Sequence, residues 1–343
     1  MNKIQHDKNM VIKTSINKPD IKFYDIDDEP FRIYGIWREG DKYHRMPQAV
    51  ADTVSKGISE MCAVCAGGRV RFVTDSPYVA IKVEYGNYEL SCMTPTLAMA
   101  GFDAYADGKF AGAFRPAVDF DGSPLESVLE LGEKKERLVT INFPLYSEVK
   151  SMLIGLSDSA IITHAPDYNL EKPVVFYGSS ITNGAGASRP GATYVSRLAR
   201  ELDINFHCLG FGGLAKGEAE MADYIASLDM SAFVMDYDHN AKNTEYLTAT
   251  HEPFFKKVRS AHPNIPIILV SRPDLAHDTQ ARFEVIKTTY ENAKKNGDEN
   301  VYLVNGMDFF GGDLDYTVDR VHPSDLGYYF MAKGIEKALR PLI

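Results

Sequence analysis

The sequence has few cysteines, one tryptophan and no long apolar run. Its four cysteines are spread over 343 residues, which is too few for the disulfide framework of a small secreted domain. Cys62 and Cys65 have the spacing of a redox pair, but Gly67 and a strand-like segment follow them, whereas such a pair is expected at the start of a helix. We therefore expect reduced, packed thiols. No stretch approaches the roughly 18 apolar residues of a membrane span, so we expect no membrane partner.

Positive charge is also scarce. The chain has 37 Lys and Arg residues against 47 Asp and Glu residues, which gives a formal net charge of -10. Because no run of basic residues breaks this acidic balance, we expect no nucleic-acid partner. The first twenty residues lack the apolar stretch of about 7 to 15 residues that a signal peptide needs. We expect a cytoplasmic protein, with secretion still open if a leader has been removed.

The first half of the chain has the periodicity of strands. Short alternating segments are separated by turn signals such as Asp-Ser-Pro and Asp-Gly, which is typical of an antiparallel β-sandwich. We predict a jelly-roll-like, all-β domain over residues 21–166, preceded by an N-terminal extension over residues 1–20. The predicted strands lie within 31–37, 69–86, 100–114, 138–143 and 151–156, and a short helix is predicted at 47–56.

The pattern changes near residue 167, where strand-like and helix-like segments begin to alternate. Regular alternation with a spacing of about 30 residues predicts right-handed crossovers and a parallel sheet covered on both faces. We therefore predict a three-layer α/β/α sandwich with a five-stranded parallel sheet over residues 167–343. Its strands are predicted at 173–177, 204–209, 232–236, 265–270 and 301–304, and its helices at 193–202, 216–227, 251–262, 279–295 and 324–339.

Two motifs of this second half bear groups suited to acyl transfer. Ser180 follows Gly178-Ser179 at the end of the first predicted strand, where glycine permits a tight turn. Asp319 and His322 precede the last helix, and their spacing lets the carboxylate orient the ring that faces a serine. Alone, each motif also fits a blander structure, a serine helix cap or a surface Asp beside a cap histidine. Functional groups of parallel sheets collect beyond the carboxyl ends of the strands, which favours a common site.

In combination these motifs resemble the SGNH, or GDSL-like, hydrolases, whose catalytic domain is flavodoxin-like. The resemblance rests on Gly-x-Ser-Ile-Thr, a glycine after the second strand, an asparagine after the third and Asp-x-x-His-Pro near the C-terminus. It implies that Ser180 is the nucleophile, with His322 as its base and Asp319 orienting that base. It also implies an oxyanion hole formed with the backbone of Gly213, for which Gly212 is a near alternative, and the side chain of Asn240.

The sequence departs from the family pattern at two places, and the second departure points to a subgroup of the family. Ser179 stands where the family has aspartate, so Ser179 is a rival nucleophile, ranked below Ser180. The third block reads Asp-His-Asn in place of Gly-x-Asn-Asp, as in a subgroup with an N-terminal Gly-x-Asp-Leu-Tyr signature. Residues 101–105, Gly-Phe-Asp-Ala-Tyr, match that signature except for Ala104. Members of this subgroup resemble carbohydrate-active esterases, which implies removal of acetyl or other small acyl groups from a sugar, with no cofactor.

Two other functions remain as alternatives. In a metal-dependent hydrolase, carboxylates and histidines of the second half would converge on one ion. The candidate ligands are Asp236, Asp238, His239, Asp319 and His322. In a noncatalytic glycan-binding protein, the sandwich would recognise sugar and the degenerate Ser179 position would mark a lost activity. Trp37 and Arg272 are weaker candidates for lining a sugar or acyl site. The sequence leaves the oligomeric state open.

Overall fold

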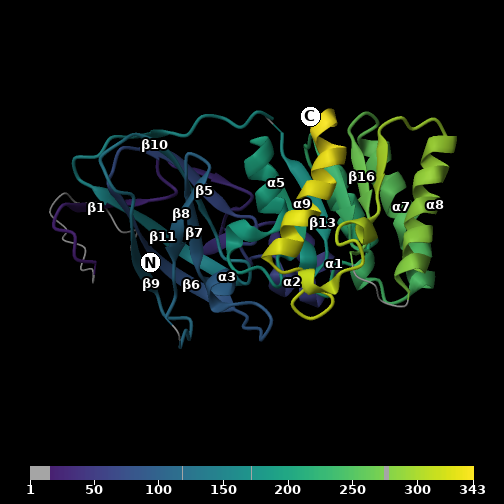
Figure 1. Ribbon diagram of the computed structural model, residues 1–343, viewed down its shortest axis with the longest axis horizontal. Coiled ribbons are helices and arrows are strands. Elements are labelled where there is room, and N and C mark those ends of the chain that lie inside the picture. Colours follow the sequence, from purple (N-terminus) through teal and green to yellow (C-terminus); the bar gives the residue numbers. More distant parts are fainter. Residues whose placement is uncertain (1–15, 118, 171, 274–277) are drawn as a thin grey trace.

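In the computed structural model, residues 16–117, 119–170, 172–273 and 278–343 are described. They form an elongated molecule in which a β-rich half and an α/β half lie side by side (Figure 1). The predicted N-terminal extension falls mostly outside the described residues. Within the described residues, no helix is long and apolar enough to cross a membrane.

The β-rich half consists of two antiparallel sheets with an apolar core between them, as predicted. One sheet has the order β1-β11-β6-β9 and the other β12-β5-β10-β7-β8, with β2 paired to β5 and a separate β3-β4 hairpin. The strands are β1 (Ile21–Asp25), β2 (Arg32–Tyr34), β3 (Trp37–Glu39), β4 (Lys42–His44), β5 (Arg69–Thr74), β6 (Tyr78–Tyr88), β7 (Phe102–Ala106), β8 (Lys109–Phe114), β9 (Leu125–Glu130), β10 (Arg137–Asn142), β11 (Ser147–Ser157) and β12 (Ile162–His164).

One predicted strand is wrong, and a glycine explains the difference. The segment 31–37 forms two short strands, β2 and the start of β3, instead of one. Between them Gly35 has a φ of 75°, and a Cβ there would lie 2.6 Å from the Gly67 carbonyl oxygen. Only glycine fits this close approach, so the chain turns there. The predicted hairpin of β7 and β8 is confirmed, with a left-handed Asp107-Gly108 turn that suits paired strands.

The α/β half has the predicted five-stranded parallel sheet, in the order β14-β13-β15-β16-β17. Alternate residues of each strand enter separate cores on its two faces, as the burial of Phe176 and Tyr177 in different clusters shows. The strands are β13 (Val174–Gly178), β14 (Phe206–Gly210), β15 (Ala232–Asp236), β16 (Ile267–Val270) and β17 (Val301–Val304). The helices are α4 (Ser180–Asn183), α5 (Tyr194–Leu202), α6 (Ala219–Ser227), α7 (Thr244–Ala261), α8 (Thr279–Lys295) and α9 (Asp325–Leu339).

Helix α7 begins earlier than the predicted position 251. The side chain of Asn243 accepts a hydrogen bond from the Tyr246 backbone and caps the helix, while Pro253 lies inside it. Proline is most common in the first turn of a helix, so its presence here makes the start of the helix hard to locate from sequence.

The two halves share a core. Helices α1 (Gln48–Val54), which was predicted, and α2 (Lys56–Met61), which was not, belong by sequence to the β-rich half. Their buried residues Ala51 and Ile58 nevertheless pack in the same cluster as Tyr177 of the parallel sheet. A third short helix, α3 (Thr96–Ala100), packs near the lower border of the halves in Figure 1.

The β-rich half also covers one edge of the parallel sheet, at β14. Strand β14 is an edge strand, and two buried arginines of the β-rich half donate hydrogen bonds to its carbonyl groups. Arg45 Nη1 lies 2.6 Å from the Gly210 oxygen, and Arg69 Nη1 lies 3.2 Å from the Phe206 oxygen. This pairing satisfies backbone acceptors that an exposed edge would leave free for another chain.

Candidate active site

The turn that bears the predicted nucleophile, Ser180, follows β13, the strand beside the edge strand β14. A Cβ at Gly178 would lie 2.0 Å from the Thr182 hydroxyl oxygen and 2.4 Å from the Asp236 carbonyl oxygen, so the turn requires glycine. Ser179 is buried, and its side chain accepts a hydrogen bond of 3.1 Å from the Ile181 backbone N–H. Ser179 is therefore the cap of α4 and faces away from solvent. Ser180, the first residue of α4, is partly exposed.

The second part of the site is the loop before α9. Asp319 Oδ1 accepts hydrogen bonds from the backbone N–H groups of Val321, at 3.1 Å, and His322, at 2.8 Å. Its other oxygen lies 2.8 Å from His322 Nδ1, and His322 Nε2 lies 2.9 Å from the Ser180 hydroxyl oxygen. The structure thus joins Ser180, His322 and Asp319 in one chain of hydrogen bonds, in the order that the sequence predicts for a catalytic triad.

The environment of Asp319 favours its ionised form. Partial burial acts to raise its pKa, but the hydrogen bonds from the backbone and ring of His322 and from the Val321 backbone outweigh burial and lower the pKa below its usual value. A carboxylate held in this way fixes the tautomer of His322 with Nε2 facing the serine. The side chain of His322 is 15% exposed and that of Asp319 is 30% exposed, so this pair borders solvent.

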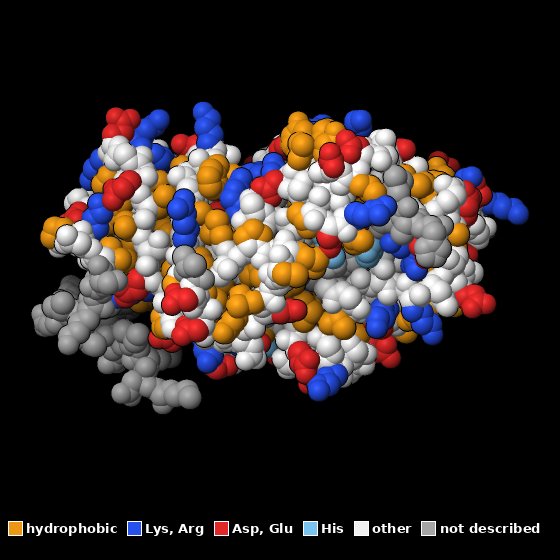
Figure 2. Space-filling view, turned by 60° about the horizontal axis from the view of Figure 1, so that its bottom comes forward, with side chains coloured by type: hydrophobic (Ala, Val, Ile, Leu, Met, Phe, Trp, Pro, Cys, Tyr) orange, Lys and Arg blue, Asp and Glu red, His pale blue; other side chains and the backbone are white. Residues whose placement is uncertain are grey.

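The site lies on the face of the molecule where the carboxyl ends of the parallel strands meet. This face comes forward in Figure 2, where histidine atoms reach the surface beside a band of hydrophobic side chains. The loop after β14 runs along Ser180, because a Cβ at Gly212 would lie 3.6 Å from Ser180 Cβ. A Cβ at Gly213, which has a φ of 69°, would meet no heavy atom within 4 Å. The side of this loop at Gly212 therefore faces Ser180, and the role assigned to Gly213 stays a prediction.

Asn240 is joined to the same loop. It ends a short 3-10 helix after β15, Asp238–Asn240, and its side-chain amide donates a hydrogen bond of 3.0 Å to the Phe211 carbonyl oxygen. An asparagine amide has two N–H groups, so the second remains as a candidate oxyanion donor. The hydrogen bond holds Asn240 beside this loop, residues 210–213, which we call the glycine loop.

A network of buried hydrogen bonds supports the turn that bears Ser180. Asp236 accepts hydrogen bonds from the hydroxyl groups of Thr182, at 3.1 Å, and Tyr194, at 3.0 Å. Burial raises the pKa of Asp236 well above its usual value. Tyr328 of α9 donates to the Ile181 and Ala185 carbonyl oxygens, so the turn is tied to the helix that follows His322.

The candidate metal ligands do not form one group. Asp236 is engaged by hydroxyl groups, and Asp238 accepts a hydrogen bond from the Arg272 backbone. Across residues 16–117, 119–170, 172–273 and 278–343, no three His, Cys, Asp or Glu side chains are placed to share a metal ion. The geometry therefore gives the metal-dependent alternative no ligand set among these residues.

Trp37 and Arg272 lie outside the hydrogen-bond chain of Ser180. Trp37 packs edge-on against His207 with ring centroids 6.0 Å apart. Arg272 follows β16, and its guanidinium group lies 3.4 Å from Asp278. Their assignment to a sugar or acyl site stays a prediction.

Arg45, which belongs to no motif in the sequence, also supports the site. Its side chain is completely buried, and it donates hydrogen bonds to Asn183 Oδ1 at 2.8 Å and to the Gly210 oxygen at 2.6 Å. The guanidinium group also lies over the Phe211 ring, 4.3 Å from its centroid. Arg45 therefore holds the end of α4 and the start of the glycine loop together. No local sequence pattern marks Arg45, because its partners Asn183 and Gly210 lie 138 and 165 positions away in the chain.

The signature-like segment 101–105 has a related role. Asp103 is fully buried and pairs with Arg189 at 2.7 Å and with the Gly191 backbone at 3.0 Å. Nearby, Thr94 accepts a hydrogen bond of 3.0 Å from the Gly186 backbone. Both contacts hold the loop that follows the nucleophile helix. The signature motif marks Asp103 in the sequence, but nothing in the sequence identifies Arg189 as its partner.

The chain belongs to the GDSL-like lipase/acylhydrolase family, which residues 171–340 match. Residues 21–162 match the N-terminus of the Esterase_SGNH_hydro type, which confirms the predicted two-part resemblance. Membership of this family makes the protein a carboxylic ester hydrolase. Among curated proteins, none matches the chain.

Solved structures show the same arrangement over nearly the whole chain. A protein from Bacteroides ovatus described as a GDSL-like lipase is 30% identical, with a TM-score of 0.85 and coverage of 94% of this chain and 98% of that chain. The salicylyl-acyltransferase SsfX3 of a tetracycline biosynthetic pathway is 21% identical, with a TM-score of 0.78 and coverage of 95% and 98%. The acetyl xylan esterase Est2A of Butyrivibrio proteoclasticus is 16% identical, with a TM-score of 0.61 and coverage of 94% and 98%. The last two similarities show the fold alone.

Proposed function

We propose that the protein is a serine esterase that removes a small acyl group, such as acetyl from a carbohydrate, through a covalent intermediate on Ser180. The observation that carries this proposal is the hydrogen-bond chain from Ser180 through His322 to Asp319. It supports nucleophilic catalysis because the hydroxyl group, its base and the group that orients the base are all within contact distance. The cap formed by Ser179 supports Ser180 over its rival, since the Ser179 hydroxyl is engaged by the helix.

In this mechanism neutral His322 takes the proton of Ser180 as the hydroxyl oxygen attacks the ester carbonyl. The resulting imidazolium is stabilised by Asp319 and returns the proton to the leaving alcohol. Water then repeats the sequence and releases the acid and the free serine. Asp319 remains ionised throughout, which agrees with its lowered pKa.

The negative charge on the attacked carbonyl oxygen needs donors fixed in advance. We assign these to the backbone N–H of Ser180, the backbone of Gly213 or its neighbour Gly212, and the side chain of Asn240. Preorganised donors of this kind each contribute roughly 3 to 4 kcal/mol of transition-state stabilisation. The hydrogen bond from Asn240 to Phe211 supports this assignment because it fixes the amide beside the loop.

The proposed substrate class rests on the fold and on its relatives. The Butyrivibrio proteoclasticus neighbour is an acetyl xylan esterase, and a Clostridium thermocellum neighbour is a family two carbohydrate esterase. In this proposal residues 167–343 carry the chemistry, and residues 21–166 form an accessory domain that supports the site.

The test combines active-site labelling with a substrate panel. We expect a fluorophosphonate to add one equivalent to the full chain, seen by intact mass, and to leave Ser180→Ala unlabelled while Ser179→Ala is labelled. Nitrophenyl acetate and acetylated xylan should be hydrolysed faster than a long-chain nitrophenyl ester, with no loss of activity on chelation. Labelling of Ser180→Ala would reject the nucleophile, and inhibition by chelator would favour a metal-dependent reaction.

A further inference from the structure

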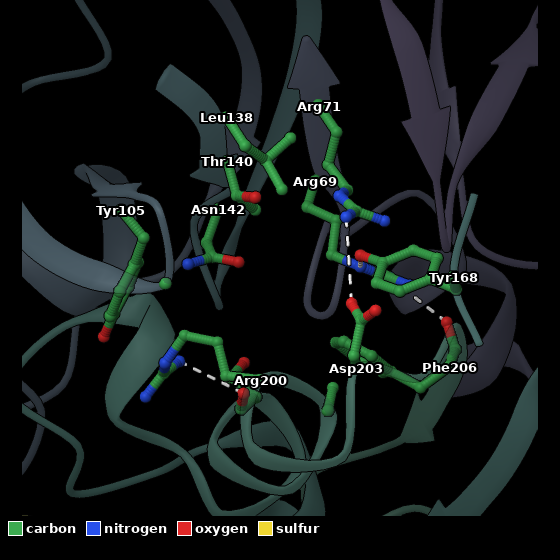
Figure 3. Close-up of a pocket in the computed structure, with 13 residues that line it drawn as sticks. Arg69, Arg71, Tyr105, Leu138, Thr140, Asn142, Tyr168, Arg200, Asp203 and Phe206 are labelled. Carbon is green, nitrogen blue, oxygen red and sulfur yellow. Dashed lines mark hydrogen bonds and ion pairs between the residues drawn. The ribbon is translucent and has the colours of Figure 1, made fainter. Parts of the chain in front are cut away.

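A polar pocket lies between the two halves, lined by residues that take no part in the hydrogen-bond chain of Ser180, His322 and Asp319. Its volume is about 80 Å³. By this measure one water needs roughly 10 to 15 Å³, so the pocket admits several waters or one small polyatomic ion. Figure 3 shows that strands of the β-rich half supply one wall, with Arg69, Arg71 and Thr140, and that the α/β half supplies Arg200 and Asp203.

The pocket carries an excess of positive charge. Three arginines line it, whereas Asp203 is the one carboxylate among the described residues of its lining. Arg69 donates to the hydroxyl of Tyr168, to the side chain of Asn205 and to backbone oxygens, which are all neutral. Arg200 donates to two backbone oxygens and stacks on an aromatic ring. These bonds satisfy donors on both guanidinium groups, but none of the bonds is to a carboxylate, in a protein whose net charge is -10.

Arg71 is the least satisfied of the three. It is 2% exposed, and its guanidinium plane lies over the Tyr168 ring, 3.8 Å from the centroid. Its Nη2 lies 3.8 Å from Asp203 Oδ1, which is an ion pair but longer than a hydrogen bond. Its Nη1 is buried and has no hydrogen-bond partner among the described residues. A buried guanidinium N–H without an acceptor is destabilising, so this position calls for an added acceptor oxygen.

We propose that the pocket binds a small oxyanion of the size and chemistry of phosphate or sulfate. Arg71 lines the pocket, and a guanidinium group is a strong donor to the oxygens of such an ion; Thr140 lines the same pocket. Because Arg71 lies on β5 and Arg200 on α5, the bound ion joins the two halves of the molecule. This proposal does not depend on the esterase mechanism.

The test is calorimetric titration of the full chain with sodium phosphate, and separately with sodium sulfate, at constant ionic strength set with chloride. We expect saturable binding at one site and a rise in Tm of about 2 °C at roughly ten times Kd. Arg71→Gln should weaken binding at least tenfold. Arg137→Gln is the matched control, because this arginine lies at the start of β10, is not among the residues that line the pocket, and donates to the backbone oxygens of Lys135 and Glu133. It should bind phosphate like the natural protein.

A second variant keeps the test decisive if Arg71→Gln fails to fold. Asp203 has a φ of 49°, a left-handed conformation that asparagine adopts readily, so Asp203→Asn should preserve the backbone. Removing this carboxylate removes repulsion of the anion, and we expect phosphate to bind about threefold more tightly. Absence of saturable binding in the natural protein, equal binding by Arg71→Gln, or weaker binding by Asp203→Asn would each overturn the proposal.

Discussion

The two halves of the molecule contribute to the active site in different ways. In the proposed mechanism the α/β half supplies the reacting groups, from the turn after β13 and from the loop of Asp319 and His322, which borders solvent. The β-rich half supplies buried side chains, Arg45 and Asp103, that hold the backbone around those groups. Reacting groups must meet the substrate and cannot be fully packed, so their precision depends on neighbours that are packed. The proposed reacting groups therefore lie in the α/β half, and the β-rich half contributes side chains that hold them in position.

Removing the nucleophile gives the largest expected effect. Ser180→Ala should lower kcat by roughly four or more powers of ten, because the reacting hydroxyl is lost. Adding His322→Ala should lower kcat little further, since the members of a triad act as one unit. Steady-state kinetics on a confirmed ester measures both. Full activity in Ser180→Ala would end the serine mechanism.

The next effect concerns the oxyanion donor. Asn240→Ala should lower kcat by roughly a hundred- to a thousandfold, because one fixed donor is removed while the nucleophile remains. Intact mass should still show a covalent acyl intermediate in this variant. An Asn240→Ala enzyme with unchanged kcat would place the oxyanion hole elsewhere.

A positioning residue of the β-rich half should have a smaller effect of a different kind. We expect Arg45→Met to lower kcat about tenfold with little change in KM, since the glycine loop loses its anchor. It should also lower the free energy of unfolding by about 1 to 3 kcal/mol, because the Gly210 and Asn183 oxygens lose a buried donor. Arg45→Lys should restore part of kcat, whereas the surface control Arg137→Gln should match the natural protein. A stability loss without any change in kcat would make Arg45 purely structural.

Replacing Ser179 distinguishes a helix cap from a nucleophile at this position. Ser179→Ala removes the cap of α4 and should lower the free energy of unfolding by about 1 kcal/mol, with kcat within a few-fold of the natural protein. Urea denaturation and steady-state kinetics give the two values. A loss of kcat as large as that of Ser180→Ala would make Ser179 the nucleophile.

The smallest effect is the pH dependence of stability from Asp319. Its folded-state pKa is below the usual 3.8, so the ionised carboxylate stabilises the fold above that value, and this contribution is lost as pH falls below it. The free energy of unfolding of the natural protein minus that of Asp319→Asn should therefore shrink between pH 6 and roughly pH 2, by less than about 1 kcal/mol in this partly exposed position. A difference independent of pH would contradict the lowered pKa.

The sequence by itself determined the two-part fold and singled out the proposed reacting groups. Two-residue periodicity specifies strands that bury one face, and the regular alternation of strands and helices admits essentially one handed, parallel arrangement. Ser180, Asp319 and His322 could be proposed because their motifs occur together in the order of the SGNH hydrolases, whereas each motif alone also fits a helix cap or a surface Asp.

Only the tertiary structure decided which distant side chains support those groups. The contacts of Arg45 with Gly210 and of Asp103 with Arg189 join residues 165 and 86 positions apart. Likewise, α1 and α2 pack on the parallel sheet although their sequence neighbours form the sandwich. Local patterns in the sequence predict which residues are buried, but not which distant residues they contact. Long-range polar contacts depend on how the two halves pack against each other, which local patterns in the sequence do not specify.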